Sequence, residues 1–357
     1  PDTGELTTKA RDLNGNGVID FNGTDAIEMT QTSYVLSGNW YRQTVSSCYE
    51  IDGQATATIL STTRQQLSGL GAGGFSVASQ SIDPQGNVTS QTTTINRTTR
   101  TVTTTTDSPD SNLNAVQISI DGKPSTSTTD TISTPTVYNS YDALERPTTV
   151  TSPRGVVTTT VYHPTTGRVT SVTQAGKQTS YTYHPSGMPG AGKVATETLP
   201  DTKVIRTSYT LHGEVFRIWG GATYPLERSY DSYGQPQLLK TYRAGTGWTG
   251  TTWPVSPGKA TTYAYHSDGK MQSRQCARGP VTTYTWNNRG LPASTTHDDS
   301  TPPVTTVYDR ANRPKTLVDA AGTHTYNYSV PLKTSETIVG GILGGTSRSA
   351  IQDIYER

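Results

Sequence analysis

The feature that most constrains this chain is an aromatic residue that returns about every 21 residues through the C-terminal two-thirds of the sequence. The aromatic positions are Tyr141, Tyr162, Tyr183, Tyr209, Tyr230, Tyr265, Trp286, Tyr308 and Tyr328. The gaps between successive positions are 21, 21, 26, 21, 35, 21, 22 and 20 residues. A fixed period of this size is typical of a repeat protein, in which each unit packs against its neighbours along the chain.

Two turns in each period divide it into two strands. One turn follows the aromatic residue directly, as at Asp142–Glu145, and the second lies 14 residues after it, as at Gly155 and Gly176. Two turns in 21 residues leave two strands of ordinary length. The segment Tyr181-Thr182-Tyr183 alternates aromatic and polar residues with the period of a strand that has two different faces. One period therefore predicts one β-hairpin, and we expect the aromatic residues to stack between neighbouring hairpins.

The high threonine content explains how such strands can form with few apolar residues. Only 31% of the residues are hydrophobic. Threonine is β-branched and polar, so it favours a strand and can still face water. The nearly continuous threonine run at Thr89–Thr106 therefore predicts strands and not a disordered linker.

The best-preserved repeats read YDALER at 141–146, YDSYGQ at 230–235 and YDRANR at 308–313. They resemble the YD repeats of the Rhs/YD-repeat family, which includes bacterial Rhs shells, toxin-complex C components, wall-associated YD-repeat proteins and teneurins. The resemblance covers residues 116–357 and reaches back faintly to Ile51. Several repeats replace the aspartate, at His163, His184, Thr210, His266 and Asn287. The resemblance implies a spiral of antiparallel β-hairpins that forms part of a hollow shell or tube.

Three regions follow from this reading. Residues 1–30 form a hairpin segment with a calcium-type loop, residues 31–115 a degenerate β-repeat region, and residues 116–357 the YD-repeat spiral. In the middle region, Ser37-Gly38-Asn39 and Asp52-Gly53-Gln54 predict tight turns, the second between strands at 40–45 and 55–60. We expect the chain to be a fragment of a longer repeat protein.

The N-terminal segment holds the one motif with recognisable site chemistry. Its oxygen-bearing side chains fall at positions 1, 3, 5 and 9 of an EF-hand-type loop, with Gly17 at position 6, but the glutamate expected at position 12 is Gly23. The candidate Ca²⁺ ligands are Asp12, Asn14, Asn16, the Val18 carbonyl, Asp20 and Asp25. The alternative is a turn in which the Asp and Asn side chains bond only their own backbone. The sequence leaves both open.

Charge and motif content exclude several classes of function. The 29 basic and 28 acidic residues are balanced and form no basic run, so nucleic acid is not an expected partner. No apolar run is long enough to span a bilayer. Cys48 and Cys276 are the only cysteines, which gives no disulfide framework and leaves their pairing open. No catalytic motif is present, so we expect a protein that is not an enzyme.

The family resemblance implies a non-catalytic shell segment that encapsulates a polypeptide cargo, a toxin, for secretion or delivery. The alternative is an extracellular adhesin or a self-assembling surface fibre, in which copies of the chain pair through open strand edges. The insertion at 244–258 carries Trp248 and Trp253, which either contact carbohydrate or a cell surface or pack inside the shell. Either function places the chain outside the cell or on its surface.

Overall fold

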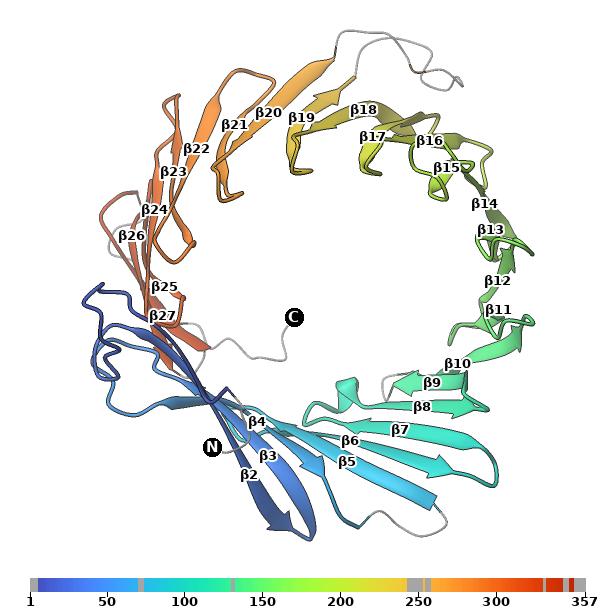
Figure 1. Ribbon diagram of the computed structural model, residues 1–357, viewed down its shortest axis with the longest axis horizontal. Coiled ribbons are helices and arrows are strands. Elements are labelled where there is room, and N and C mark those ends of the chain that lie inside the picture. Colours follow the sequence, from blue (N-terminus) through green and yellow to red (C-terminus); the bar gives the residue numbers. More distant parts are fainter. Residues whose placement is uncertain are drawn as a thin grey trace. The chain divides into compact units, whose positions relative to one another are not determined.

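The computed structural model describes residues 6–69, 74–129, 132–242, 253, 258–329, 332–342 and 347–349. Successive strands lie side by side as antiparallel hairpins, and the one helical element in these ranges is the 3-10 turn η1 (Ser111–Leu113) (Figure 1). The predicted all-β class and the prediction of successive hairpins are confirmed. None of these residues forms a helix long and apolar enough to cross a membrane.

The chain divides into two compact units. The first consists of Pro1–Val137, Thr285–Thr295 and Pro302–Arg357, and the second of Tyr138–Tyr284 and Thr296–Thr301. The boundaries expected at residues 30 and 115 stay predictions, although strand β2 (Ala26–Ser37) runs across the first of them without a break.

The N-terminal part of the first unit is a run of long strands, each paired antiparallel with the next. They are β1 (Thr8–Arg11), β2, β3 (Asn39–Cys48), β4 (Thr58–Gln66), β5 (Gly74–Ile82), β6 (Val88–Asn96), β7 (Thr101–Asp107), β8 (Ala115–Ile120), β9 (Lys123–Thr129) and β10 (Ile132–Tyr141). The threonine run forms β6 and β7 as predicted, and Thr93 lies opposite Thr104 with their hydroxyls 3.4 Å apart.

The second unit is built from shorter strands that follow the 21-residue period. They are β11 (Pro147–Thr151), β12 (Val157–Tyr162), β13 (Val169–Gln174), β14 (Lys177–Tyr183), β15 (Val194–Thr198), β16 (Val204–Tyr209), β17 (Val215–Gly220), β18 (Thr223–Tyr230), β19 (Pro236–Thr241), β20 (Lys259–Tyr265), β21 (Met271–Gln275) and β22 (Val281–Trp286). The first unit resumes with β23 (Pro292–His297), β24 (Val304–Tyr308), β25 (Pro314–Asp319), β26 (Gly322–Ser329), β27 (Leu332–Val339) and β28 (Ser347–Ser349). Most repeat aromatic residues are the last residue of their strand.

A β-bulge accompanies the repeat aromatic residue in most periods. The pairing register shifts between Val161 and Tyr162 and between Thr182 and Tyr183. The same shift occurs at Tyr209, Tyr230, Tyr265, Tyr308 and Tyr328. A bulge bends its strand and redirects the side chain at that point. The irregularity is therefore part of the repeat, and it places each aromatic ring at the same point relative to the following turn.

The turn predicted at Asp52-Gly53-Gln54 is formed, with the Gln54 N–H bonded to the Ile51 carbonyl at 3.2 Å and Gly53 at a φ of 78°. The strand predicted after it is wrong in its start, because the turn lies within a nine-residue connection between β3 and β4, and β4 begins at Thr58 and not at residue 55. Glu50 and Ile51 donate their backbone N–H groups to the Gln54 side-chain oxygen, which organises a wider loop. The turn at Ser37-Gly38-Asn39 is confirmed, with Gly38 at a φ of 72°.

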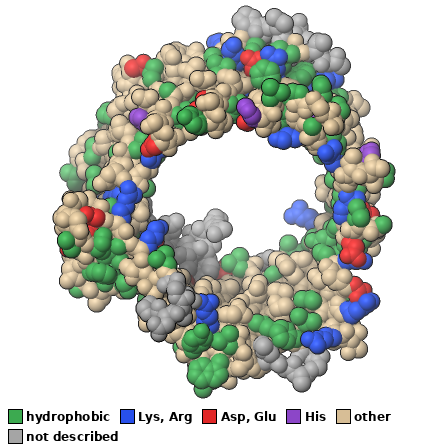
Figure 2. All heavy atoms as spheres, in the orientation of Figure 1, with side chains coloured by type: hydrophobic (Ala, Val, Ile, Leu, Met, Phe, Trp, Pro, Cys, Tyr) green, Lys and Arg blue, Asp and Glu red, His purple; other side chains and the backbone are tan. Residues whose placement is uncertain are grey.

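Few hydrophobic side chains are fully buried in the described part of the chain. They are Ile27, Tyr41, Cys48, Tyr49, Tyr242 and Ile338. Uncharged polar side chains and backbone dominate the face shown in Figure 2, with small separate groups of hydrophobic and charged atoms. Burial raises the pKa of the Cys48 thiol to about 11, and Cys48 and Cys276 are both free thiols. With so thin a core, contacts between adjacent hairpins have to contribute much of the stability.

The insertion predicted at 244–258 lies mostly outside the described residues, Trp248 included. Trp253 is described and packs edge-on against Trp219 and Tyr242, with ring centroids 5.6 and 5.2 Å apart. The Arg217 guanidinium lies 4.8 Å from the Trp253 ring centroid. Trp253 therefore packs on residues of the sheet, and the two alternatives for the insertion stay predictions.

Candidate functional site: the repeat turn and the N-terminal loop

The turn after each repeat aromatic residue is organised by the residue that follows it. Asp142 Oδ1 accepts the N–H groups of Leu144 and Arg146 at 2.9 and 3.0 Å, and Asp142 Oδ2 accepts a hydrogen bond from Arg146 Nε at 2.8 Å. The hydrogen bond from the Arg146 side chain holds the pKa of Asp142 below its usual range. Where the aspartate is replaced, Nδ1 of His163 or Oδ1 of Asn287 takes over as acceptor of turn N–H groups. The replacements at His163 and Asn287 therefore preserve the acceptor, whereas the His184 ring bonds the Thr207 carbonyl instead.

Arg146 also joins its own hairpin to the next one. Its Nη1 donates to the Gly167 carbonyl at 2.6 Å, 21 residues further on. Its guanidinium carbon lies 4.0 Å from the centroid of the Tyr162 ring, a cation–π distance. The Tyr162 hydroxyl in turn donates to the Pro147 carbonyl at 3.1 Å. One arginine thus contacts its own aspartate, the next turn and the next aromatic ring.

This contact between hairpins recurs along the chain. The tyrosine hydroxyl donates to the carbonyl that begins the preceding hairpin's second strand, over 2.5–3.1 Å, at Tyr162, Tyr183, Tyr209, Tyr230, Tyr265, Tyr308 and Tyr328. Further cations lie over the rings, namely Arg168 on Tyr183, Lys193 on Tyr209 and Arg313 on Tyr328. The rings lie between neighbouring hairpins, as predicted. Their partners are cations and carbonyl groups, which the prediction of aromatic stacking did not include.

The predicted calcium loop forms a compact turn closed by its own side chains. Asp12 Oδ1 and Oδ2 accept the backbone N–H groups of Gly15 and Gly17 at 2.6 and 2.7 Å. Asn14 Oδ1 accepts the Asn16 N–H at 3.0 Å. These are the bonds of an Asx-type turn, and a carboxylate oxygen that accepts one such bond retains a second lone pair.

The remaining predicted ligands complete the loop from its C-terminal side. Asn16 accepts the Val18 N–H at 2.8 Å, and its amide donates to Asp20 Oδ2 at 2.9 Å. Asp25 is fully buried and accepts the N–H groups of Leu13 and Asp20, each at 2.9 Å. The hydrogen bond from the Asp20 N–H is the largest effect that lowers the pKa of Asp25.

The structure thus brings the six predicted ligand residues into one loop. Within the described ranges, no three His, Cys, Asp or Glu side chains are grouped so that they could hold a metal ion. The hydrogen bonds are those of the plain-turn alternative, and calcium binding stays a prediction.

A buried arginine that the sequence analysis missed joins the N-terminal segment to the 308–313 repeat. Arg310 is 2% exposed, and its Nε donates to the Asp25 carbonyl at 2.8 Å. Its Nη atoms donate to the carbonyls of Phe21 and Ile51 at 3.2–3.3 Å. The guanidinium carbon lies 5.1 Å from the Tyr49 ring centroid. One side chain therefore satisfies three carbonyls that are about 260–290 residues away in sequence.

Two ion pairs extend this contact. Arg313 bonds Asp309 at 2.8 Å and lies 3.3 Å from the buried Glu50 carboxylate. Lys315 lies 3.2 Å from Asp52 at an exposed position. We call residues 21–27 and 49–52 the N-terminal clasp. One feature of the sequence could have indicated this contact. Arg310 directly follows the Tyr-Asp pair, whereas the same position holds the small, exposed residues Ala143 and Ser232 in the other two repeats.

Comparison with known proteins finds the fold and no sequence relative. No family model and no curated protein matches the chain. The crystal structure of TcdB2-TccC3 matches 87% of this chain with a TM-score of 0.52 and 11% identity, and the Photorhabdus luminescens Tc holotoxin pore gives the same values. TcdB2-TccC3 without its hypervariable C-terminal region matches 91% of this chain with a TM-score of 0.51 and 12% identity.

These structures are Rhs/YD-repeat toxin-complex proteins, and this chain shares their fold. The fold implied by the sequence resemblance, a run of antiparallel β-hairpins like those of a toxin-complex shell, is confirmed. This chain spans about a fifth of the length of those chains, from 21% to 22%.

Replacing Arg310 with Met tests the clasp. The carbonyls of Phe21, Asp25 and Ile51 would lose their buried donor, so we expect the free energy of unfolding of the first unit to fall by about 2–4 kcal/mol. Urea denaturation measures the loss, and hydrogen exchange should show faster exchange at residues 21–27. Arg100→Met is the matched control because the Arg100–Asp121 pair is exposed, and such pairs contribute little. Equal effects of the two substitutions would show that the clasp contributes no stability.

Calcium binding is tested by the melting temperature in millimolar calcium and in chelator. Without the position-12 glutamate we expect a weak site, with a Kd of roughly 10⁻⁴–10⁻³ M, whose occupation stabilises the folded loop. The melting temperature should therefore fall when calcium is removed, and Asp12→Asn should abolish the difference. An unchanged melting temperature in the original chain would assign the loop to the plain turn.

Proposed function

We propose that this chain is a non-catalytic wall segment of an Rhs/YD-type shell that encloses a polypeptide cargo, a toxin, for secretion or delivery. The observation that carries the proposal is the repeated contact in which an aromatic ring of one hairpin meets a cation and a carbonyl of the hairpin before it. The shared fold with TcdB2-TccC3 supports the same role.

Contacts of this kind suit a wall. Each hairpin binds only its neighbours in sequence, so adding repeats extends the sheet without requiring a larger core. Threonine-rich strands need few apolar residues, and the clasp joins the 308–313 repeat to residues about 285 positions earlier. A sheet extended in this way can enclose volume, whereas a catalytic site needs a cleft with converging reactive groups.

We propose the cargo, the delivery step and the secreted or cell-surface setting for a longer protein. This chain would form one segment of that protein. The structures similar to it are four to five times longer, since this chain spans 21–22% of each. A shell of that length could hold a polypeptide that a segment of this size could not enclose.

Electron microscopy of the natural full-length product, combined with protease protection, tests the proposal. We expect discrete hollow particles with internal density, and a cargo segment that resists protease until urea opens the particle. A protease-sensitive loop tag on the outer surface is the control, because it should be cut without urea. Open-ended filaments of repeating subunits would favour the fibre alternative, and particles whose C-terminal polypeptide is cut at the same rate as the tag would contradict encapsulation.

A further inference from the structure

One YD repeat keeps the motif aspartate and lacks the motif arginine. Asp142 and Asp309 each accept a hydrogen bond from an arginine Nε four residues further on, at 2.8 Å in both repeats. In the 230–235 repeat the corresponding pair is Asp231 and Gln235. The carboxylate is retained, and the cation that neutralises it in the other two repeats is missing.

The turn at Asp231 is otherwise formed in the same way. Asp231 Oδ1 accepts the N–H groups of Tyr233 and Gln235, each at 2.9 Å. Gln235 Nε2 donates to the Gly269 carbonyl at 3.1 Å, and so reproduces the bond that Arg146 makes to the next turn. A neutral amide cannot balance the carboxylate charge. Among the residues that the structure describes, none donates a side-chain hydrogen bond to Asp231 Oδ2.

The ring that the missing arginine would cover also has no cation over it. By its place in the repeat this ring is Tyr265, whose hydroxyl donates to the Pro236 carbonyl at 2.7 Å as in the other repeats. No lysine or arginine of the described ranges lies over it, whereas Arg146 lies 4.0 Å from the Tyr162 centroid. The repeat therefore has both halves of a cation site, a carboxylate and an aromatic face, without the cation.

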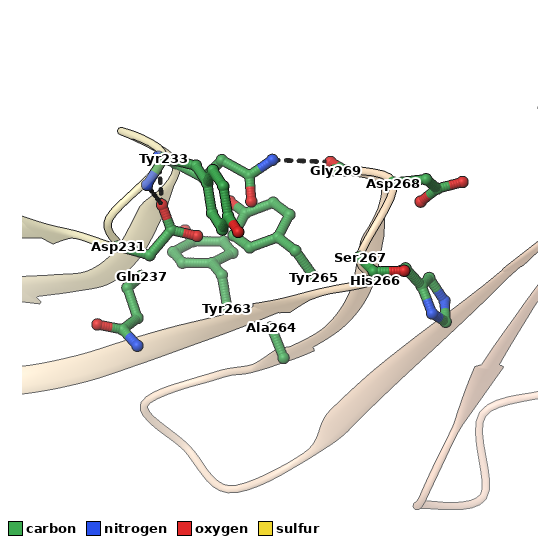
Figure 3. Close-up of a pocket in the computed structure, with 11 residues that line it drawn as sticks. Asp231, Tyr233, Gln237, Tyr263, Ala264, Tyr265, His266, Ser267, Asp268 and Gly269 are labelled. Atoms are coloured by element: carbon green, nitrogen blue, oxygen red, sulfur yellow. Dashed lines mark hydrogen bonds between the residues drawn. The ribbon is translucent and has the colours of Figure 1, made fainter.

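A groove of about 600 Å³ lies at this position. Its lining includes Asp231, Tyr233, Gln235, Tyr263, Tyr265 and Asp268. Figure 3 shows the rings of Tyr233, Tyr263 and Tyr265 gathered beside Asp231. Tyr233 is 89% exposed, so an incoming group can reach its ring. The second aspartate of the groove, Asp268, is paired with Lys270, which leaves Asp231 as the carboxylate with uncompensated charge.

A second groove in the same unit has a cation of the chain itself in its lining. It measures about 620 Å³ and lies between the turn that starts at His163 and the strand that ends at Tyr183. Its lining includes Arg168, whose guanidinium carbon lies 5.4 Å from the Tyr183 ring centroid. The two grooves occupy equivalent places in the repeat, and the groove at 163–192 contains a cation from its own chain.

We propose that the groove at Asp231 binds a guanidinium or primary ammonium group of another molecule. Asp231 Oδ2 forms the ion pair, and the faces of Tyr265 and Tyr233 make cation–π contacts. An arginine or lysine side chain of a bound polypeptide fits best, because an arginine of the chain itself lines the equivalent groove beside its tyrosine ring. A free organic cation has the same chemistry. The proposal does not depend on the shell function, because it follows from the vacancy in the repeat.

The site should be weak for a single cation, because the ion pair is partly exposed and pairs of that kind contribute little alone. A Kd of roughly a millimolar is expected for one side-chain analogue. Ligand-observed NMR titration of the whole chain is suited to that range. The probes are N-acetyl-argininamide, its neutral isostere N-acetyl-citrulline amide, and the peptide Gly-Gly-Arg-Gly-Gly.

We expect saturable binding of the arginine probes and at least tenfold weaker binding of the citrulline probe. Gln235→Arg should fill the site from within, reduce binding at least tenfold and raise the melting temperature. Asp231→Asn keeps the turn acceptor and should also weaken binding about tenfold, since a neutral amide replaces the charged partner. Asp201→Asn is the matched control because Asp201 is an exposed turn aspartate paired with Lys203, outside the groove, and it should leave binding unchanged.

Tighter binding of the peptide than of the free amide assigns the site to a polypeptide, and equal binding assigns it to small organic cations. The proposal is overturned if no saturable binding is found, if citrulline binds as well as arginine, or if Asp231→Asn has no larger effect than Asp201→Asn. Full binding by a folded Gln235→Arg variant would likewise place the cation elsewhere.

Discussion

The structure depends on one type of contact, in which a tyrosine hydroxyl bonds a carbonyl of the preceding hairpin and, in four of the repeats, a cation lies over the ring. In the 141–146 repeat, Arg146 supplies the cation and Pro147 the carbonyl, and Tyr162 receives both. The ring buries apolar area that the threonine-rich strands do not provide, while its hydroxyl stays paired. Each of these contacts joins one repeat to the next. The 21-residue period of the sequence therefore sets the spacing of the hairpins in the sheet.

Other features follow from this constraint. The bulge before Tyr162 turns the ring toward the preceding hairpin, and the Asp142 turn fixes the arginine that covers it. Substitutions in the motif show which elements are essential to the fold. His163 and Asn287 can replace the aspartate because each still accepts turn N–H groups. Gln235 can replace the arginine because it keeps the bond to the next turn, but it leaves a carboxylate and an aromatic face unoccupied.

The sequence predicted what depends on local pattern and missed what depends on distant contacts. The alternation of aromatic and polar residues and the turn residues predicted the hairpins. The run of β-branched residues at Thr89–Thr106 predicted the strands β6 and β7. The role of Arg310 could not be predicted, because its partners lie about 260–290 residues away and only the folded chain brings them together. The turn at Asp52-Gly53 was predicted correctly, but the start of the next strand was not, because bonds to the Gln54 side chain hold a wider connection around that turn. The predicted calcium ligands do lie in one loop, although hydrogen bonds alone account for its shape.

A double-mutant cycle on Arg146 and Tyr162 tests most directly whether the cation–ring contact holds adjacent hairpins together. The free energy of unfolding of the second unit is measured for Arg146→Met, Tyr162→Leu and the double variant. We predict a coupling free energy of about 1 kcal/mol or more between these two residues, and additivity within about 0.3–0.5 kcal/mol for Arg146→Met with Tyr183→Leu, which belong to different contacts. Additive effects of Arg146 and Tyr162 would contradict the central role of this contact.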